Sequence, residues 1–105
     1  MIIDDIYNEL KNDDIVKNAF EFSTKFLNKN KSYYSVIKTR QQLPNLETML
    51  YLDEMLNETA DFYSKYNYPH FKRKNKRINE LIHQLHQHTK FQNFLNKLKK
   101  NVLAN

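Results

Sequence analysis

The chain has 105 residues, 40% hydrophobic and 28% charged, so we expect one small hydrophobic core and a single domain over residues 1–105. It has no cysteine, which excludes disulfides and thiolate metal sites, and no glycine, which excludes glycine-rich phosphate loops. The net charge of +5 is uneven, because residues 1–64 hold 7 Lys/Arg and 11 Asp/Glu (−4), whereas residues 65–105 hold 10 and 1 (+9).

Residues 2–12 predict a first, short helix, because apolar side chains recur there at helical spacing. A wider apolar stripe predicts a second, well-buried helix over residues 15–29. We expect Asn30 to follow it in the left-handed conformation, which Asn tolerates best after glycine. Residues 32–42 fit a helix or a strand, and we favour a helix because no second strand is available for pairing.

A long third helix is predicted over residues 46–66, with Asn45 as its N-terminal cap. Two apolar edges run along it, which indicates contacts on two sides, as in a helix bundle. Asp53 interrupts one of these edges. We expect Asn67, in a left-handed conformation, and Pro69 to turn the chain after this helix.

The last helical region is predicted to begin near residue 71 and to carry two apolar stripes that are slightly out of phase. Thr89 and Gln92 have the spacing of a capping box, so a bend or restart is expected near residue 89. Together these elements predict an all-α fold: an antiparallel four-helix bundle with short loops and a basic helical C-terminal extension.

The sequence offers few residues for catalysis or metal binding. His83, His86 and His88 gather in the run HQLHQH, and Glu80 with His83 has the Glu-x-x-His spacing of di-metal helical bundles. Because no second such motif exists, we expect polar surface histidines, no metal and no cofactor, although a metal on His83 and His86 stays an alternative. No acid, base and nucleophile can be placed together, so we expect a protein that is not an enzyme.

The strongest signal is the run YNYPHFKRKNKR at residues 66–77, because cations at the start of a helix oppose its macrodipole. These cations can pair with the chain's own acidic half, hold nucleic-acid phosphates while the aromatics stack on bases, lie on anionic lipid or dock an acidic protein face. Further lysines flank an apolar face in residues 90–105, which either packs on the bundle or binds a surface. The candidate partner-binding residues are Lys72, Arg73, Lys74, Lys76, Arg77, Lys97, Lys99 and Lys100.

The N-terminus carries two acids, Asp4 and Asp5, and lacks the apolar run of a signal peptide. No stretch approaches the ~20 apolar residues of a membrane span. We therefore expect a cytoplasmic protein, with partial membrane association left open. The 14 Asn and 14 Lys against 3 Arg are typical of an AT-rich genome and hint at a low-GC bacterium.

In helix layout the chain resembles the immunity proteins of pediocin-like (class IIa) bacteriocins, the enterocin A immunity family of low-GC Gram-positive bacteria. Two segments carry the resemblance, IYNELKNDDIVKNAFEFSTKFLNKN and LPNLETMLYLDEMLNETADFYSKYNYPHFKRKNKRINELIHQL. The resemblance implies an antiparallel four-helix bundle without a catalytic signature. It also implies protection of the producer cell by engaging the bacteriocin-bound sugar-transport receptor from the cytoplasmic side, with specificity in the last helix and tail.

From the sequence we therefore expect a monomeric, non-enzymatic binding protein of the bacteriocin-immunity kind, whose partner is a membrane receptor, an acidic protein surface or an anionic membrane surface. The alternative is a small basic nucleic-acid-binding or regulatory protein of a mobile element that uses Lys72–Arg77 on phosphates.

Overall fold

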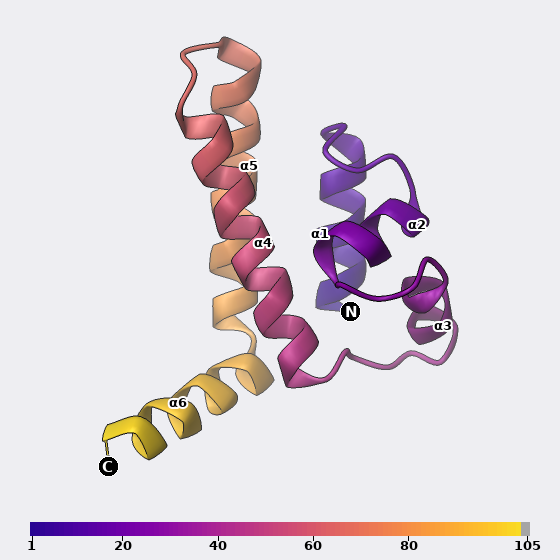
Figure 1. Ribbon diagram of the computed structural model, residues 1–105, viewed down its shortest axis with the longest axis vertical. Coiled ribbons are helices and arrows are strands. Elements are labelled where there is room, and N and C mark those ends of the chain that lie inside the picture. The colour runs from indigo at the N-terminus through magenta and orange to yellow at the C-terminus, as the bar shows by residue number, and fades with distance from the viewer. Residues whose placement is uncertain (104–105) are drawn as a thin grey trace.

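The structure, a computed structural model, describes residues 1–103, and all regular elements in this part of the chain are helical (Figure 1). The all-α fold class is therefore confirmed. In chain order the elements are α1 Ile2–Asn12, α2 Ala19–Glu21, the π-helix η1 Phe22–Phe26, α3 Tyr33–Thr39, α4 Leu46–Ser64, α5 Pro69–Gln87 and α6 Thr89–Leu103.

An antiparallel hairpin of α4 and α5, each of 19 residues, forms the spine of the molecule (Figure 1). α1 packs on α5, and η1 packs on α4, so the first third of the chain covers one side of the hairpin. α6 leaves the foot of the hairpin at an angle and contacts both long helices. Within residues 1–103 this arrangement does not confirm a four-helix bundle, because only α4 and α5 are a long antiparallel pair.

The predicted second helix over residues 15–29 is wrong in its extent. Asn18 caps α2 by accepting a backbone N–H at 2.9 Å, so the helix begins only after it. The next turn is π-helical around Ser23, whose side chain is fully buried. The Ser23 hydroxyl donates to the Ala19 carbonyl at 2.9 Å and accepts the Tyr34 N–H at 3.0 Å, which ties this turn to α3. These local hydrogen bonds compete with a continuous helix, which apolar periodicity cannot reveal.

Within residues 1–103, three residues take the left-handed conformation, and none is glycine. They are Asp14, Asn28 and Gln41, with φ of 58°, 54° and 52°. The prediction of this conformation for Asn30 and Asn67 is wrong. The left-handed residue after this segment is Asn28 and not Asn30, because the π-helical segment ends earlier than a helix over residues 15–29 would.

The long hairpin begins as predicted, because the Asn45 side chain accepts the Thr48 N–H at 2.8 Å. α5 starts at Pro69 rather than near residue 71, since the fixed φ of proline suits the first helical position. Tyr68 leads into it with extended backbone, φ −102° and ψ 137°, so Asn67 needs no left-handed turn. The helix predicted within residues 32–42 is confirmed as α3.

One hydrophobic core joins the N-terminal third to the hairpin, and the first turn of α6 closes its lower end. No helix within residues 1–103 has the length and apolar character needed to cross a bilayer. The largest fully buried side chains are Ile3, Ile6, Leu10, Phe22, Leu27, Tyr34, Met49, Leu52, Leu56, Ile78, Leu81 and Phe91.

The predicted break near residue 89 is confirmed, one position earlier. His88 has extended backbone, φ −67° and ψ 126°, and α6 restarts at Thr89. Phe91 is fully buried, so the start of α6 packs back on the body, whereas Leu98 and Val102 further along are exposed. Packing on the body thus holds for the start of the tail, whereas surface binding by its exposed remainder stays a prediction, and residues 104–105 lie outside the described residues.

Candidate binding surface

The five cations at the start of α5 separate into different environments. Arg77 Nε lies 3.4 Å from Glu9 and 3.3 Å from Asp13, and its terminal nitrogen lies 3.0 Å from Glu80. Glu9 and Asp13 belong to the end of α1, so Arg77 clamps α1 to α5. The intramolecular alternative therefore holds for Arg77.

Lys74 is half-buried and lies over an aromatic ring of the neighbouring helix. Its Nζ is 5.5 Å from the centre of the Tyr63 ring, within the range of a cation–π contact. This cation therefore contributes to the packing of α4 against α5.

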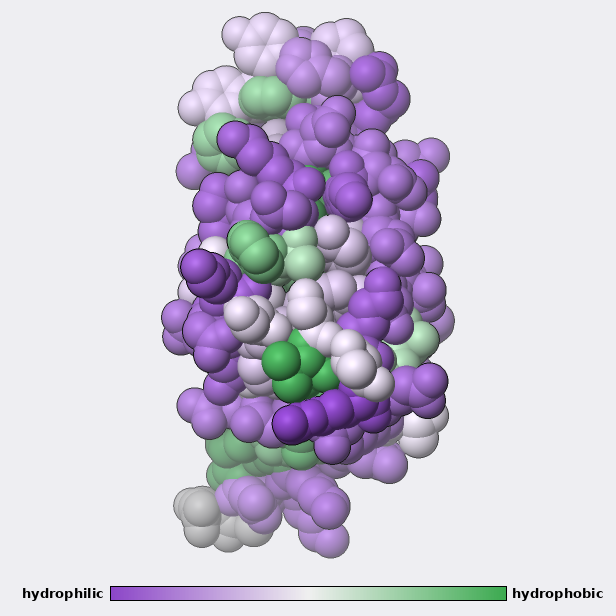
Figure 2. Space-filling model, turned by 90° about the vertical axis from the view of Figure 1, so that its right-hand side faces the viewer, coloured by the Kyte–Doolittle hydropathy of each residue, from purple (hydrophilic) through white to green (hydrophobic). Residues whose placement is uncertain are grey.

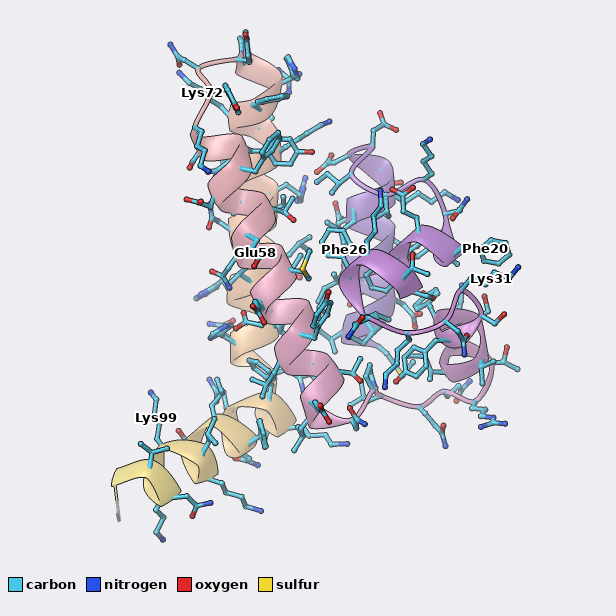
Figure 3. The ribbon with its side chains drawn as sticks, in the orientation of Figure 1. Phe20, Phe26, Lys31, Glu58, Lys72 and Lys99 are labelled. Carbon is cyan, nitrogen blue, oxygen red and sulfur yellow. The ribbon has the colours of Figure 1, made fainter. Side chains whose placement is uncertain are left out.

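The other three cations, Lys72, Arg73 and Lys76, are exposed. Among residues 1–103, no carboxylate lies within ion-pair distance of their charged groups. Figure 3 shows Lys72 beside the loop that joins the two long helices. Lys72 and Lys65 border a shallow hollow lined also by Tyr63, Ser64, Tyr66, Asn67 and Asn75.

Aromatic side chains gather in the same place. We call residues 62–76 the hairpin tip: the last turn of α4, the loop and the first turns of α5. Phe62, Tyr66 and Tyr68 are 49%, 46% and 54% exposed, so three of the large exposed hydrophobic side chains are concentrated here. In Figure 2, pale and green atoms mark this end of the molecule beside purple charged residues.

Phe71 holds this aromatic cluster together. Its half-buried ring is the shared neighbour of five others, with centroid distances from 4.7 to 6.1 Å. The three exposed rings of Tyr66, Tyr68 and His70 form a nearly parallel series. The ring planes of Tyr66 and Tyr68 are 19° apart and their centroids are 6.4 Å apart, while those of Tyr68 and His70 are 21° and 5.8 Å apart. The rings around Phe71 are those of Phe62, Tyr63, Tyr66, Tyr68 and His70.

The electrostatics of the hairpin tip favour anions. α5 has no acidic residue in its first turn and no side-chain cap, so the positive end of its dipole lies among the cations. Asp61 is the nearest acid of α4 and pairs with Lys65 at 3.8 Å. Burial raises the pKa of the Tyr63 phenol, so its hydroxyl remains protonated, and a hydrogen-bond donor, further into the alkaline range than an exposed tyrosine.

The other predicted cations, Lys97, Lys99 and Lys100, are exposed on α6. α6 leaves the foot of the hairpin, at the opposite end from the hairpin tip, and Figure 3 shows Lys99 there. The structure therefore does not bring the two groups of predicted site residues together.

The histidines take separate roles. His86 Nε2 lies 2.7 Å from Asp53 Oδ1, which accounts for the acid on the apolar edge of α4. The Nδ1 atom of His88 is buried without a hydrogen-bond partner in the described chain, at the break between α5 and α6. His83 borders an open outer surface of α5. Residues 1–103 contain no group of three metal-ligating side chains.

The sequence prediction placed aromatic residues beside the cations, and the contact between Tyr66 and Phe71 is confirmed. It missed the part that Phe62, Tyr63 and His70 play in the cluster, and it missed the Asp53–His86 pair. Asp53 and His86 are 33 positions apart, and the acid on an apolar stripe of α4 was the one signal in the sequence for a partner on another helix.

A comparison with protein families finds a match over residues 3–99. The chain belongs to the family of unknown function DUF6626. The DUF6626 match includes the whole hairpin tip and α6 as far as Lys99. No curated protein and no solved structure matches the chain.

Proposed function

We propose that this protein is a small non-enzymatic nucleic-acid-binding protein that holds phosphate backbones with the hairpin tip. The observation that carries the proposal is the exposure of Lys72, Arg73 and Lys76, which have no carboxylate partner within residues 1–103. Glu9 and Asp13, at the end of α1, pair with Arg77 instead. All three exposed cations lie in the first two turns of α5: Lys72 borders the hollow at the end of α4, whereas Arg73 and Lys76 border a second hollow with Asp13, Arg77 and Glu80.

Nucleic acid suits such a surface because its phosphates are closely spaced and carry condensed counterions. Each Lys or Arg that contacts a phosphate releases counterions, so the affinity depends steeply on salt.

The experiment is an anisotropy titration of a labelled oligonucleotide at salt concentrations from about 50 to 200 mM. The test variant replaces Lys72, Arg73 and Lys76 by Ala. The control replaces Lys97, Lys99 and Lys100 by Ala, which removes the same charge at the other end of the molecule.

For a single strand, the tip variant should lower the slope of log affinity against log salt by about 2, since each contact contributes about 0.7. The control variant should leave most of the slope. Equal losses of slope in both variants would show that binding depends on the overall charge of the protein and not on the hairpin tip. Absence of binding at the lowest salt concentration would refute the proposal.

A second candidate is the bacteriocin-immunity function, and α6 favours it. Leu98 and Val102 are 44% and 66% exposed, and lysines flank them, so α6 presents an apolar face with a cationic border. This candidate treats α1, the α2–η1 segment, α4 and α5 as a distorted four-helix bundle. It places the contact with a membrane receptor, from the cytoplasmic side, on α6.

The test of the second candidate is expression in a sensitive strain that is challenged with a panel of class IIa bacteriocins. Protection should occur with the native chain and be lost with Leu98→Asp and Val102→Asp together. Unchanged killing across the panel would rule this candidate out.

A further inference from the structure

The exposed rings of the hairpin tip have a geometry that plain phosphate binding does not use. Tyr66 and Tyr68 lie nearly parallel and more than two-fifths exposed, and His70 continues the series. Phe71 supports them from inside at centroid distances of 5.9, 5.4 and 4.7 Å. Exposed aromatic rings that a packed ring holds in place lose little conformational entropy when a flat ligand stacks on them.

Positive charge lies directly beside these rings. The hollow at the tip is lined by the Tyr63 and Tyr66 rings together with Lys65 and Lys72. A flat group on a ring and a phosphate on an adjacent ammonium can therefore be bound at once. This pairing of stacking platforms with a cationic groove is how proteins hold single strands without sequence preference.

We propose that the hairpin tip binds single-stranded nucleic acid in preference to duplex, with bases stacked on Tyr66 and Tyr68 and phosphates held by Lys72 and its neighbours. This inference rests on the proposed function and names its ligand class. In a duplex the base faces are covered by neighbouring bases, so the rings can reach them only by unstacking a step. A single strand presents its bases without that cost.

The ring geometry of the tip favours this ligand over a lipid surface. Tyr and Phe side chains also lie at membrane interfaces, so their exposure alone does not distinguish the two ligands. The ring planes of Tyr66 and Tyr68 are only 19° apart, which suits flat bases, whereas a lipid surface does not require parallel rings. The exposed aliphatic side chains Val36, Leu98 and Val102 lie elsewhere, on α3 and α6.

The experiment compares three labelled ligands of equal length: a single strand, the matching duplex and an abasic strand that keeps the phosphates and lacks the bases. The test variant replaces Tyr66 and Tyr68 by Leu, which keeps apolar bulk and removes the rings. One control replaces both by Phe, which keeps the rings. A second control is Phe20→Leu, because Phe20 is 55% exposed on α2, far from the tip (Figure 3).

The native chain should bind the single strand more tightly than the duplex or the abasic strand. Each stacked base lost in the Leu variant should weaken single-strand binding by roughly 5-fold or more, with abasic binding unchanged. Both controls should retain native affinity. The chain has 7 Tyr and no Trp, so tyrosine emission should be quenched by the single strand and not by the abasic one.

Three results would overturn the inference. Equal binding of all three ligands, insensitive to the tyrosines but lost in the Lys72, Arg73 and Lys76 variant, would refute stacking and leave the proposed function intact. No binding of any strand would refute both, and so would tyrosine-dependent binding to anionic vesicles alone.

Discussion

Replacing Arg77 by Gln tests whether this cation stabilises the fold, in contrast to the exposed cations that we assign to binding. The guanidinium lies 3.0 to 3.4 Å from three carboxylates, of which Glu9 is on α1 and Asp13 directly follows it. All partners are partly exposed, with Arg77 at 41% and Asp13 at 31%, so each pair contributes at most about 1 kcal/mol. We expect the free energy of unfolding to fall by about 1–2 kcal/mol, because α1 also loses its charged link to α5.

The matched control is Lys76→Gln, which removes the same charge from the adjacent position and should change stability by less than about 0.5 kcal/mol. Urea unfolding followed by circular dichroism measures both variants. At about 1 M salt the Debye length falls to ~3 Å, so the Arg77→Gln effect should shrink markedly. Equal destabilisation by the two variants, or an Arg77→Gln effect that ignores salt, would refute the assignment.

Three other substitutions test further parts of the fold. Phe91→Ala should cost about 3–5 kcal/mol of unfolding free energy in urea titration, since this fully buried ring anchors α6, whereas exposed Leu98→Ala should cost under about 1 kcal/mol. Burial, and then the 2.5 Å hydrogen bond to Asp4, raise the pKa of Tyr34 well above its usual range. Its contribution to stability is therefore complete below pH ~10 and is lost as the pH rises toward the folded pKa, so Tyr34→Phe should flatten the alkaline fall seen in pH-dependent melting. Gln41→Gly should stabilise by up to about 1 kcal/mol by thermal melting, because glycine removes the steric cost of φ 52°; a destabilised variant would contradict that view of the turn.

Much of the helix layout is predictable from periodicity and capping. Asn45 caps α4 as its position before an apolar run suggests, and the break before Thr89 follows from two stripes that are out of phase. The second helix is not predictable in this way, because the π-turn at Ser23 depends on a hydrogen bond to Tyr34, which is 11 positions away.

The residue types of the candidate site are predictable from the sequence, but which cations pair within the chain and which stay exposed is not. The run at residues 72–77 contains five cations, and sequence alone assigns them one environment. The packing of α1 against α5 brings Asp13 to Arg77, whereas Lys76 stays exposed. Such assignments depend on tertiary contacts, which local patterns do not encode.

The most direct test of the central claim is a map of amide chemical-shift changes when a single-stranded oligonucleotide is titrated into the labelled protein. The hairpin tip, residues 62–76, should carry the largest changes, with Lys72 and Tyr68 among them and the exposed end of α6 unaffected. Changes centred on α6 or on the α1–α3 side, or none at low salt, would contradict binding at the hairpin tip.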